Sequence, residues 1–385
     1  MSDELKKIDS AHIMSTYKRH DLLLEWGEGC YVFDQSGKKY LDFIGGIATC
    51  TVGHANKSVN KAITAQANRL ISVSNLYYSE PQIRLAHTLS RLSGLKKVFF
   101  SHSGADANET AIKLARKITG KTDFIAFKDG FHGRTTGSLA LTWKKQYREP
   151  FMPLAPSTSF ATYNDIPSLE ACITEKTAAV FIEPIQGEAG IIVPEANFLK
   201  KVREVCDRHK ILMIIDEVQT GIGRTGTFFA FQQSHIKPDI VTIAKGLANG
   251  LPIGVCISDY ELEAGDHGST LGGNSLSTAA ANATIEFIEQ HSLMQNAETV
   301  GNYLMDQLRT RSVIKDHVKE VRGKGLMVGI ELKEPLSSKY VTQAMQEGLL
   351  CNAPTPTVIR FLPPLIVTKD QVDEALNILQ KVMSP

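Results

Sequence analysis

The amino-acid sequence predicts an α/β protein with a large, mainly parallel sheet and a small α+β domain. From about residue 80, short apolar runs alternate with segments in which apolar residues recur at helical spacing. Such alternation is typical of a parallel sheet covered by helices on both faces. The 385 residues suit two domains, and the pattern changes again after the alanine-rich stretch 274–290.

The first elements can be justified in chain order. Residues 30–43 predict a hairpin that turns at Gly37. Apolar residues at helical spacing predict helices over 107–118 and 198–206. Residues 255–258 are a candidate antiparallel return strand. The other predicted strands are 98–101, 124–127, 179–182, 211–215 and 240–244.

The tail predicts the small domain. Residues 274–290 are expected to form one helix that joins the sheet to the tail. Helical segments near 292–311 and from Lys369 surround strands at 326–332 and 358–361. We therefore assign residues 1–55 to an N-terminal segment of the small domain, 56–290 to the large domain, and 291–385 to the small domain.

Composition excludes several classes of function. The 42 Lys and Arg nearly cancel the 41 Asp and Glu, so no nucleic-acid partner is expected. The six cysteines are scattered without a CxxC pair, which argues against a zinc ribbon or other metal site and for reduced thiols. The N-terminus is polar, and no apolar run reaches membrane-spanning length. A cytoplasmic protein without a membrane partner is expected.

Asp216 and Lys245 carry the strongest chemical signal. Each follows an apolar run, so both should leave the same edge of the sheet and face one ligand. An acid that pairs with a pyridine nitrogen and a lysine that forms an imine with an aldehyde are what pyridoxal 5′-phosphate requires. Burial should also lower the pKa of Lys245 and favour the neutral amine. A structural ion pair or helix cap for Asp216 and a surface position for Lys245 are the alternatives.

Two loops rich in small residues could hold a phosphate. Ser103, Gly104 and Ala105 link a predicted strand to a helix whose N-terminus offers free N–H groups. The loop 267–274 is similar, and Thr270 could donate to a phosphate. An ordinary helix cap is the alternative for the first loop.

Further polar and aromatic residues are candidates for ligand contacts. Phe131 could stack on a flat ring and Arg134 could bind a carboxylate through two N–H groups. Core packing is the alternative for Phe131 and His132. Glu188 follows a predicted strand, although a solvated turn would also explain it. Arg360 lies in an apolar run and needs a partner, either a substrate carboxylate or a structural ion pair.

Taken together, these pieces resemble the class III aminotransferases of fold type I, over nearly the whole chain. The shared motifs are Leu41-Asp-Phe43, Gly53-His54, Ser103-Gly-Ala105, Phe131-His-Gly-Arg134, Glu183-Pro-Ile-Gln-Gly-Glu188, Asp216-Glu-Val-Gln219, Lys245, Gly268-Ser-Thr270 and Arg360-Phe-Leu-Pro-Pro364. The resemblance implies an aspartate-aminotransferase-like fold. Its large domain, which binds pyridoxal phosphate, would hold a mainly parallel seven-stranded sheet beside a small α+β domain.

The resemblance also implies roles for individual residues. The implied catalytic residues are Lys245, which holds the cofactor, and Asp216, which pairs with its ring nitrogen. The implied cofactor-binding set is completed by Ser103, Gly104, Ala105, Phe131, His132, Val218, Gln219 and, from the partner subunit of a homodimer, Thr270. The implied substrate-binding residues are Arg134, Ser269 and Arg360, which would bind an α-carboxylate, with Glu188 as its gate.

The expected substrates also follow from the resemblance. Residues 244–254, 267–270 and 348–352 are most similar to the members of the family that act on acetylornithine. Those members move the terminal amine of N2-acetyl-L-ornithine to 2-oxoglutarate, which gives N-acetyl-L-glutamate 5-semialdehyde and L-glutamate in arginine biosynthesis. Ile47 stands where ornithine δ-aminotransferases have a tyrosine that contacts the free α-amine, which favours an acylated amine.

Other functions remain open at this point. Within the family they are transamination of ornithine, succinylornithine, 4-aminobutyrate or a carrier-linked lysine precursor, and a glutamate-semialdehyde aminomutase. A cofactor-free scaffold protein of the same fold is an alternative from another class. A nucleotide-binding oxidoreductase is disfavoured, because no GxGxxG motif follows a predicted strand.

Overall fold

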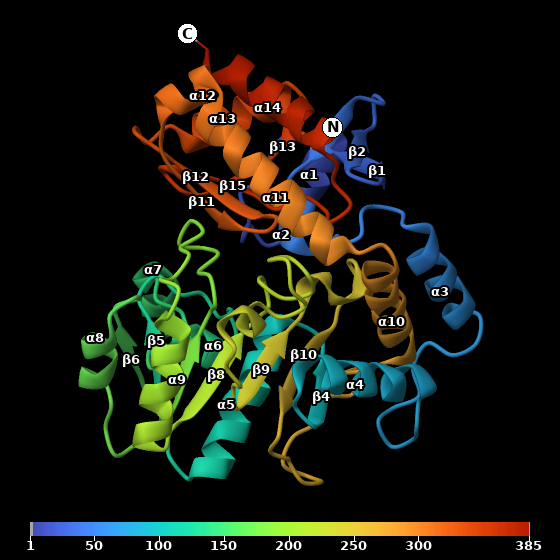
Figure 1. Ribbon diagram of the computed structural model, residues 1–385. Helices are drawn as coiled ribbons and strands as arrows, with labels where there is room; N and C mark the ends of the chain where they lie inside the picture. Colours follow the sequence, from blue (N-terminus) through green and yellow to red (C-terminus); the bar gives the residue numbers. More distant parts are fainter. Residues whose placement is uncertain (1–2, 385) are drawn as a thin grey trace.

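The computed structural model describes residues 3–384, which form two lobes (Figure 1). The larger lobe is built around a wide sheet with helices on both sides. The smaller lobe contains both ends of the chain, so the blue N-terminal strands lie beside the red C-terminal helix in Figure 1. No helix among residues 3–384 is both long and apolar enough to cross a membrane. The cytoplasmic location stays a prediction.

The large sheet has seven strands in the order β4-β10-β9-β8-β7-β5-β6. Strand β10 is antiparallel to both of its neighbours, whereas the pairs β9–β8, β8–β7, β7–β5 and β5–β6 are parallel. The predicted mainly parallel seven-stranded sheet of fold type I is therefore confirmed. The strands are β4 (Lys97–Ser101), β5 (Asp123–Phe127), β6 (Thr158–Ala161), β7 (Thr177–Ile182), β8 (Leu212–Asp216), β9 (Ile240–Ile243) and β10 (Gly254–Ser258).

Burial explains which strands the sequence could predict. The central strands β7, β8 and β9 are buried at every residue, as expected for parallel strands covered on both faces. Strand β6 was missed, because it lies at the edge of the sheet and its sequence, TSFA, contains no apolar run. The predicted return strand is β10, and it is antiparallel as expected.

Helix α5 (Gly104–Thr119) lies against the sheet and begins at the site described below. Ser103 caps it by accepting a hydrogen bond from the N–H of Asp106, and Gly120 ends it with a φ of 69°. Its buried residues recur at helical spacing, as the sequence predicts. The other helices of the larger lobe are α3 (Lys57–Ala67), α4 (Glu80–Ser93), α6 (Thr136–Leu141), α7 (Lys145–Arg148), α8 (Ile166–Ala171), α9 (Phe198–His209) and α10 (Ser275–Gln290), with 3-10 turns at Glu149–Phe151, Ala230–Ser234 and Lys245–Ala248.

Two four-stranded sheets form the smaller lobe. The first has the order β1-β2-β3-β13, and its parallel pair β3–β13 joins the N-terminal segment to the C-terminal part of the chain. The second has the order β11-β12-β15-β14. The strands are β1 (Leu24–Glu28), β2 (Tyr31–Asp34), β3 (Lys39–Asp42), β11 (Val318–Lys324), β12 (Met327–Leu332), β13 (Leu349–Leu350), β14 (Asn352–Thr355) and β15 (Val358–Phe361). The helices are α1 (Asp3–His12), α2 (Gly45–Ala48), α11 (Leu293–Thr310), α12 (Ser312–His317), α13 (Ser337–Gln346) and α14 (Lys369–Met383).

Candidate active site

The carboxyl ends of the parallel strands enclose a cavity of about 270 Å³. Strands β7, β8 and β9 end at neighbouring points of this edge, and β4 leads there into helix α5. Such an edge is the usual place for ligands in α/β sheets. The lining residues are Ser103, Gly104, Ala105, Asn108, Phe131, His132, Gly133, Arg134, Glu183, Glu188, Asp216, Val218, Gln219 and Lys245. The fold therefore brings most of the predicted site residues together.

Lys245 reaches this cavity directly after strand β9. Burial lowers the pKa of its amine, although the nearby carboxylate of Glu188 opposes the shift. The backbone of Lys245 has a φ of 44°, a left-handed conformation that a residue with a side chain adopts at a cost. A Cβ on the next residue, Gly246, would lie 1.8 Å from Oγ1 of Thr51. The lysine thus stands on a strained turn that is packed tightly against the N-terminal segment.

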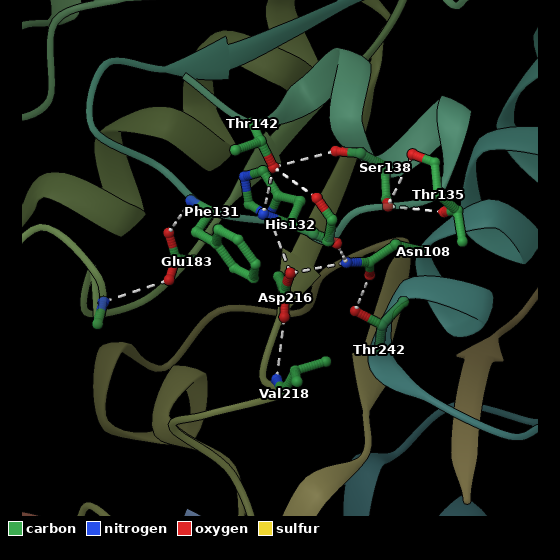
Figure 2. A network of polar contacts seen from close by, with 12 residues as sticks. Asn108, Phe131, His132, Thr135, Ser138, Thr142, Glu183, Asp216, Val218 and Thr242 are labelled. Atoms are coloured by element: carbon green, nitrogen blue, oxygen red, sulfur yellow. Dashed lines mark hydrogen bonds and ion pairs between the residues drawn. The ribbon is translucent and has the colours of Figure 1, made fainter. Parts of the chain in front are cut away.

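Asp216 is the last residue of β8 and is only 4% exposed. Its Oδ2 lies 2.8 Å from Nδ1 of His132, and its Oδ1 accepts the N–H of Val218 at 3.0 Å. Figure 2 shows that polar groups from several elements converge on this carboxylate. His132 is buried and packs edge-on against Phe181. The sequence predicts that it binds the cofactor; in this structure its ring contacts Asp216.

The start of helix α5 offers a cradle for an anion. The first N–H groups of a helix have no partner within it, and this helix is sixteen residues long. A Cβ on Gly104 would lie 2.7 Å from Cγ1 of Val218, so the turn has room only for glycine. Ser269 and Thr270, by contrast, lie outside the cavity of their own chain, where Nδ2 of Asn75 donates to the carbonyl of Ser269 at 2.9 Å.

Phe131 and Arg134 form one wall of the cavity. Glu183 accepts the N–H of Phe131 at 3.0 Å and fixes its backbone. Burial raises the pKa of that carboxyl group to about 7. The guanidinium carbon of Arg134 lies 3.3 Å from the ring centre of Tyr147 and 5.9 Å from that of Phe131. Stacking between the two rings directs the charged end of Arg134.

Arg360 does not line the active-site cavity but pairs with Glu188, which does. Nη1 of Arg360 lies 2.7 Å from Oε1 of Glu188 and also donates to Oε1 of Gln219 at 3.1 Å. Arg360 is 1% exposed, whereas the side chain of Glu188 is 36% exposed. Burial alone would raise the pKa of Glu188, but the charge and hydrogen bond of Arg360 hold it below the ordinary value. Of the two partners, the glutamate is the one with room to move.

A second cavity of about 340 Å³ adjoins the first one. The two share Phe131 and Glu188 as lining residues. Tyr147, on which Arg134 stacks, also lines the second cavity, together with Lys144. A ligand that extends from Lys245 past Arg134 would therefore enter it.

The sequence did not identify three residues that shape this site. Asn108 donates a hydrogen bond to Asp216, Thr242 donates one to Asn108, and Tyr147 orients Arg134. A weak signal existed for Thr242, because it is the one polar residue in the run Ile240-Val-Thr-Ile243. Asn108 lies inside the helix that follows the Ser103 loop, where a buried amide needs partners.

Comparisons with known proteins agree with this geometry. Residues 14–383 match the sequence profile of the family described as Aminotransferase class-III. The chain is 46% identical to the acetylornithine aminotransferase of Methanosarcina mazei, over 97% of this chain and 94% of that protein. It is also 46% identical to the acetylornithine aminotransferase of Methanopyrus kandleri, over 97% of each chain.

Solved structures with the same architecture include enzymes of two activities. An ornithine aminotransferase from Toxoplasma gondii superimposes with a TM-score of 0.94 at 29% identity, covering 100% of this chain and 95% of that one. The acetylornithine aminotransferase of Elizabethkingia anophelis gives 0.88 at 33% identity, covering 99% and 98%. A further T. gondii ornithine aminotransferase structure, with a TM-score of 0.93 at 28% identity, has partial occupancy of pyridoxal phosphate at its active site and covers 100% of this chain and 94% of that one.

Proposed function

The chain belongs to the class-III aminotransferase family, and on that premise we propose that it moves the terminal amine of N2-acetyl-L-ornithine to 2-oxoglutarate. The products would be N-acetyl-L-glutamate 5-semialdehyde and L-glutamate, a step of arginine biosynthesis. The observation that carries the proposal is the partly buried Lys245, whose amine shares one cavity with the buried carboxylate of Asp216. The names of the relatives support the choice of substrate.

The cavity fits pyridoxal 5′-phosphate. Gly104 and Ala105 at the start of α5 would hold the phosphate, Phe131 would cover the ring, and Asp216 would face the ring nitrogen. Gln219 would lie beside the phenolic oxygen. When bound, the cofactor supplies an aldehyde and an electron-withdrawing ring.

The protein's own groups would then control protons. Burial lowers the pKa of Lys245 and so favours the neutral amine, which would accept the proton from the substrate carbon that bears the nitrogen. The carboxylate of Asp216 would hold a proton on the ring nitrogen. The walls formed by Phe131 and Arg134 would orient the substrate and exclude water.

One pocket must accept two different substrates in turn. We propose that Glu188 covers Arg360 while the terminal amine reacts, and that it moves aside when 2-oxoglutarate needs the guanidinium for its α-carboxylate. The half-exposed position of Glu188 and the complete burial of Arg360 support this order of movement.

Two features support an acylated amine over free ornithine. The second cavity beyond Arg134 and Tyr147 has room for an acyl group. Ile47 lies in the segment 45–48, whose φ angles are all positive, and its neighbour Ala48 approaches Gly246 beside Lys245. An exposed isoleucine offers no hydrogen bond to a free α-amine.

We also propose a homodimer. Leu76 and Tyr78 are 85% and 95% exposed and lie in the loop that hydrogen-bonds the Ser269 loop through Asn75. Large apolar side chains at such exposure are typical of an interface. Thr270 lies near them, outside the cavity of its own chain, so it would complete the phosphate site of a second copy.

Sedimentation should give the mass of two chains. If Thr270→Ala weakens cofactor binding, mixing it with Lys245→Ala should restore one complete site per dimer.

The test of the proposed function is a comparison of amino donors. Purified protein with pyridoxal phosphate is incubated with 2-oxoglutarate and either N-acetylornithine, succinylornithine, ornithine, 4-aminobutyrate or acetyl-lysine, and released glutamate is measured. The proposal expects the highest kcat/KM with N-acetylornithine. Higher values with ornithine would assign the ornithine activity, and no turnover with any donor would refute the reaction class.

A further inference from the structure

A chain of buried hydrogen bonds reaches Asp216 from Thr242, which does not line the cavity, through Asn108, which does (Figure 2). Oγ1 of Thr242 donates to Oδ1 of Asn108 at 2.7 Å, and Nδ2 of Asn108 donates to Oδ2 of Asp216 at 2.9 Å. Asn108 is 1% exposed, and Thr242 is completely buried. Neither residue carries a role in the reaction described above.

This chain of hydrogen bonds determines the orientation of the Asp216 carboxylate. Oδ2 has two partners, the amide of Asn108 and Nδ1 of His132 at 2.8 Å. Oδ1 has one, the N–H of Val218. Each carboxylate oxygen has about two lone-pair positions for hydrogen bonds. Oδ1 therefore keeps one position with which it can accept a hydrogen bond from a ligand.

The hydroxyl of Thr242 is one of three groups that fix the orientation of the Asn108 amide, together with the carbonyl of His132 and Oδ2 of Asp216. The amide nitrogen of Asn108 uses both of its hydrogens, because it also donates to the carbonyl of His132 at 2.7 Å. Without a donor opposite its Oδ1, the amide would lose one of the three hydrogen bonds that hold it in this orientation. A flipped amide would place its oxygen against Oδ2 of Asp216, where two acceptors repel each other.

Thr242 also links the backbone of the strand that precedes Lys245 to the backbone next to Asp216. It lies in β9, three positions before Lys245, and its carbonyl accepts the N–H of Glu217 next to Asp216. The strand that delivers the lysine thus also anchors the carboxylate. In a strand that is covered on both faces of the sheet, each side chain has a fixed direction.

We propose that Thr242 and Asn108 are positioning residues that turn the carboxylate of Asp216 so that Oδ1 faces the ring nitrogen of the cofactor. The proposal rests on the proposed function, because it assumes that pyridoxal phosphate occupies the cavity. It assigns no contact with substrate to either residue. Their removal should therefore affect recognition of the ring nitrogen and kcat, and leave KM for both substrates nearly unchanged.

The test compares pyridoxal phosphate with an analogue in which the ring nitrogen is replaced by C–H. The wild-type protein should bind the natural cofactor more tightly, and Thr242→Val should reduce this preference by about tenfold, the worth of roughly one hydrogen bond. Valine keeps the β-branched shape and removes only the donor. Thr242→Ser should retain the preference. Thr284→Val is the matched control, because Thr284 is also buried and donates to the carbonyl of Ala280 in α10.

A second variant makes the result independent of whether Thr242→Val folds. Asn108→Asp keeps the shape and replaces the donor with a second carboxylate, so it should lose the preference as well. If the two residues act through one hydrogen-bond chain, the double variant should lose no more than Asn108→Asp alone. An unchanged preference in either single variant, or additive losses, would overturn the proposal. A wild-type protein that binds neither compound would instead refute the proposed function.

Discussion

Removing the carboxylate of Glu188 should increase the reactivity of the enzyme with glutamate as amino donor. In the structure, an α-carboxylate that approaches Arg360 must first displace Oε1 of Glu188, which lies 2.7 Å from Nη1. A hydrogen bond between charged groups contributes about 1.5–3 kcal/mol. Because Glu188 is 36% exposed, solvent screening favours the lower part of this range, about 1.5–2 kcal/mol.

This free energy converts into a measurable ratio of rates. Each 1.4 kcal/mol corresponds to about a factor of ten, so Glu188→Ala should raise kcat/KM for glutamate roughly 10- to 30-fold. Reactivity with N-acetylornithine should fall or stay constant, because a bare Arg360 offers nothing to a terminal amine. The assay measures the first half-reaction with each donor alone. Its rate is monitored by stopped-flow through the absorbance of the bound cofactor.

Two control variants separate gating from general disturbance. Glu188→Gln keeps an acceptor for Arg360 and loses the charge, so its effect should be intermediate. Glu347→Ala removes a carboxylate of similar exposure, 38%, which pairs with Lys381 and lines neither cavity. It should leave the ratio of the two donors unchanged. An unaltered ratio in Glu188→Ala would refute the gate.

Three further predictions concern Lys245, Asp216 and the pair His54–Asp42. Lys245→Ala should lower kcat by more than about 10²-fold and lose the absorbance of the wild-type holoenzyme, because the amine that moves the proton is gone; normal turnover would remove its assignment. Asp216→Ala should lose about 10²–10³-fold in kcat but much less cofactor affinity, as measured by titration of the apoprotein, and an unchanged rate would contradict its role. Burial disfavours charge on His54, but its hydrogen bond with Asp42 raises the pKa of His54 to about 10. This raised pKa contributes stability that is fully present below the unfolded value of about 6.5 and is lost as pH rises towards 10. Asp42→Asn should therefore destabilise the protein by about 1–3 kcal/mol in urea titrations at pH 6 and by much less at pH 10, and a constant difference would contradict the ion pair.

The sequence was sufficient to predict the sheet and the edge at which the site lies. Buried parallel strands require continuous apolar runs, so 179–182 and 211–215 were visible without any tertiary information. Asp216 and Lys245 stood out because a charge next to such a run needs a partner. The edge strand β6 was not visible, because a strand that is half-buried does not need an apolar run.

Contacts between distant residues were decided only by the tertiary structure. Arg360 and Glu188 are 172 positions apart, and Thr242 and Asn108 are 134 apart; no local pattern specifies either pair. Apolar periodicity determines which residues are buried, because burial follows from transfer out of water and has no direction. Hydrogen bonds depend on angle and on donor–acceptor distances to within a few tenths of an ångström, so the order of the strands and the packing of α5 against them had to be known before the surroundings of Asp216 could be described.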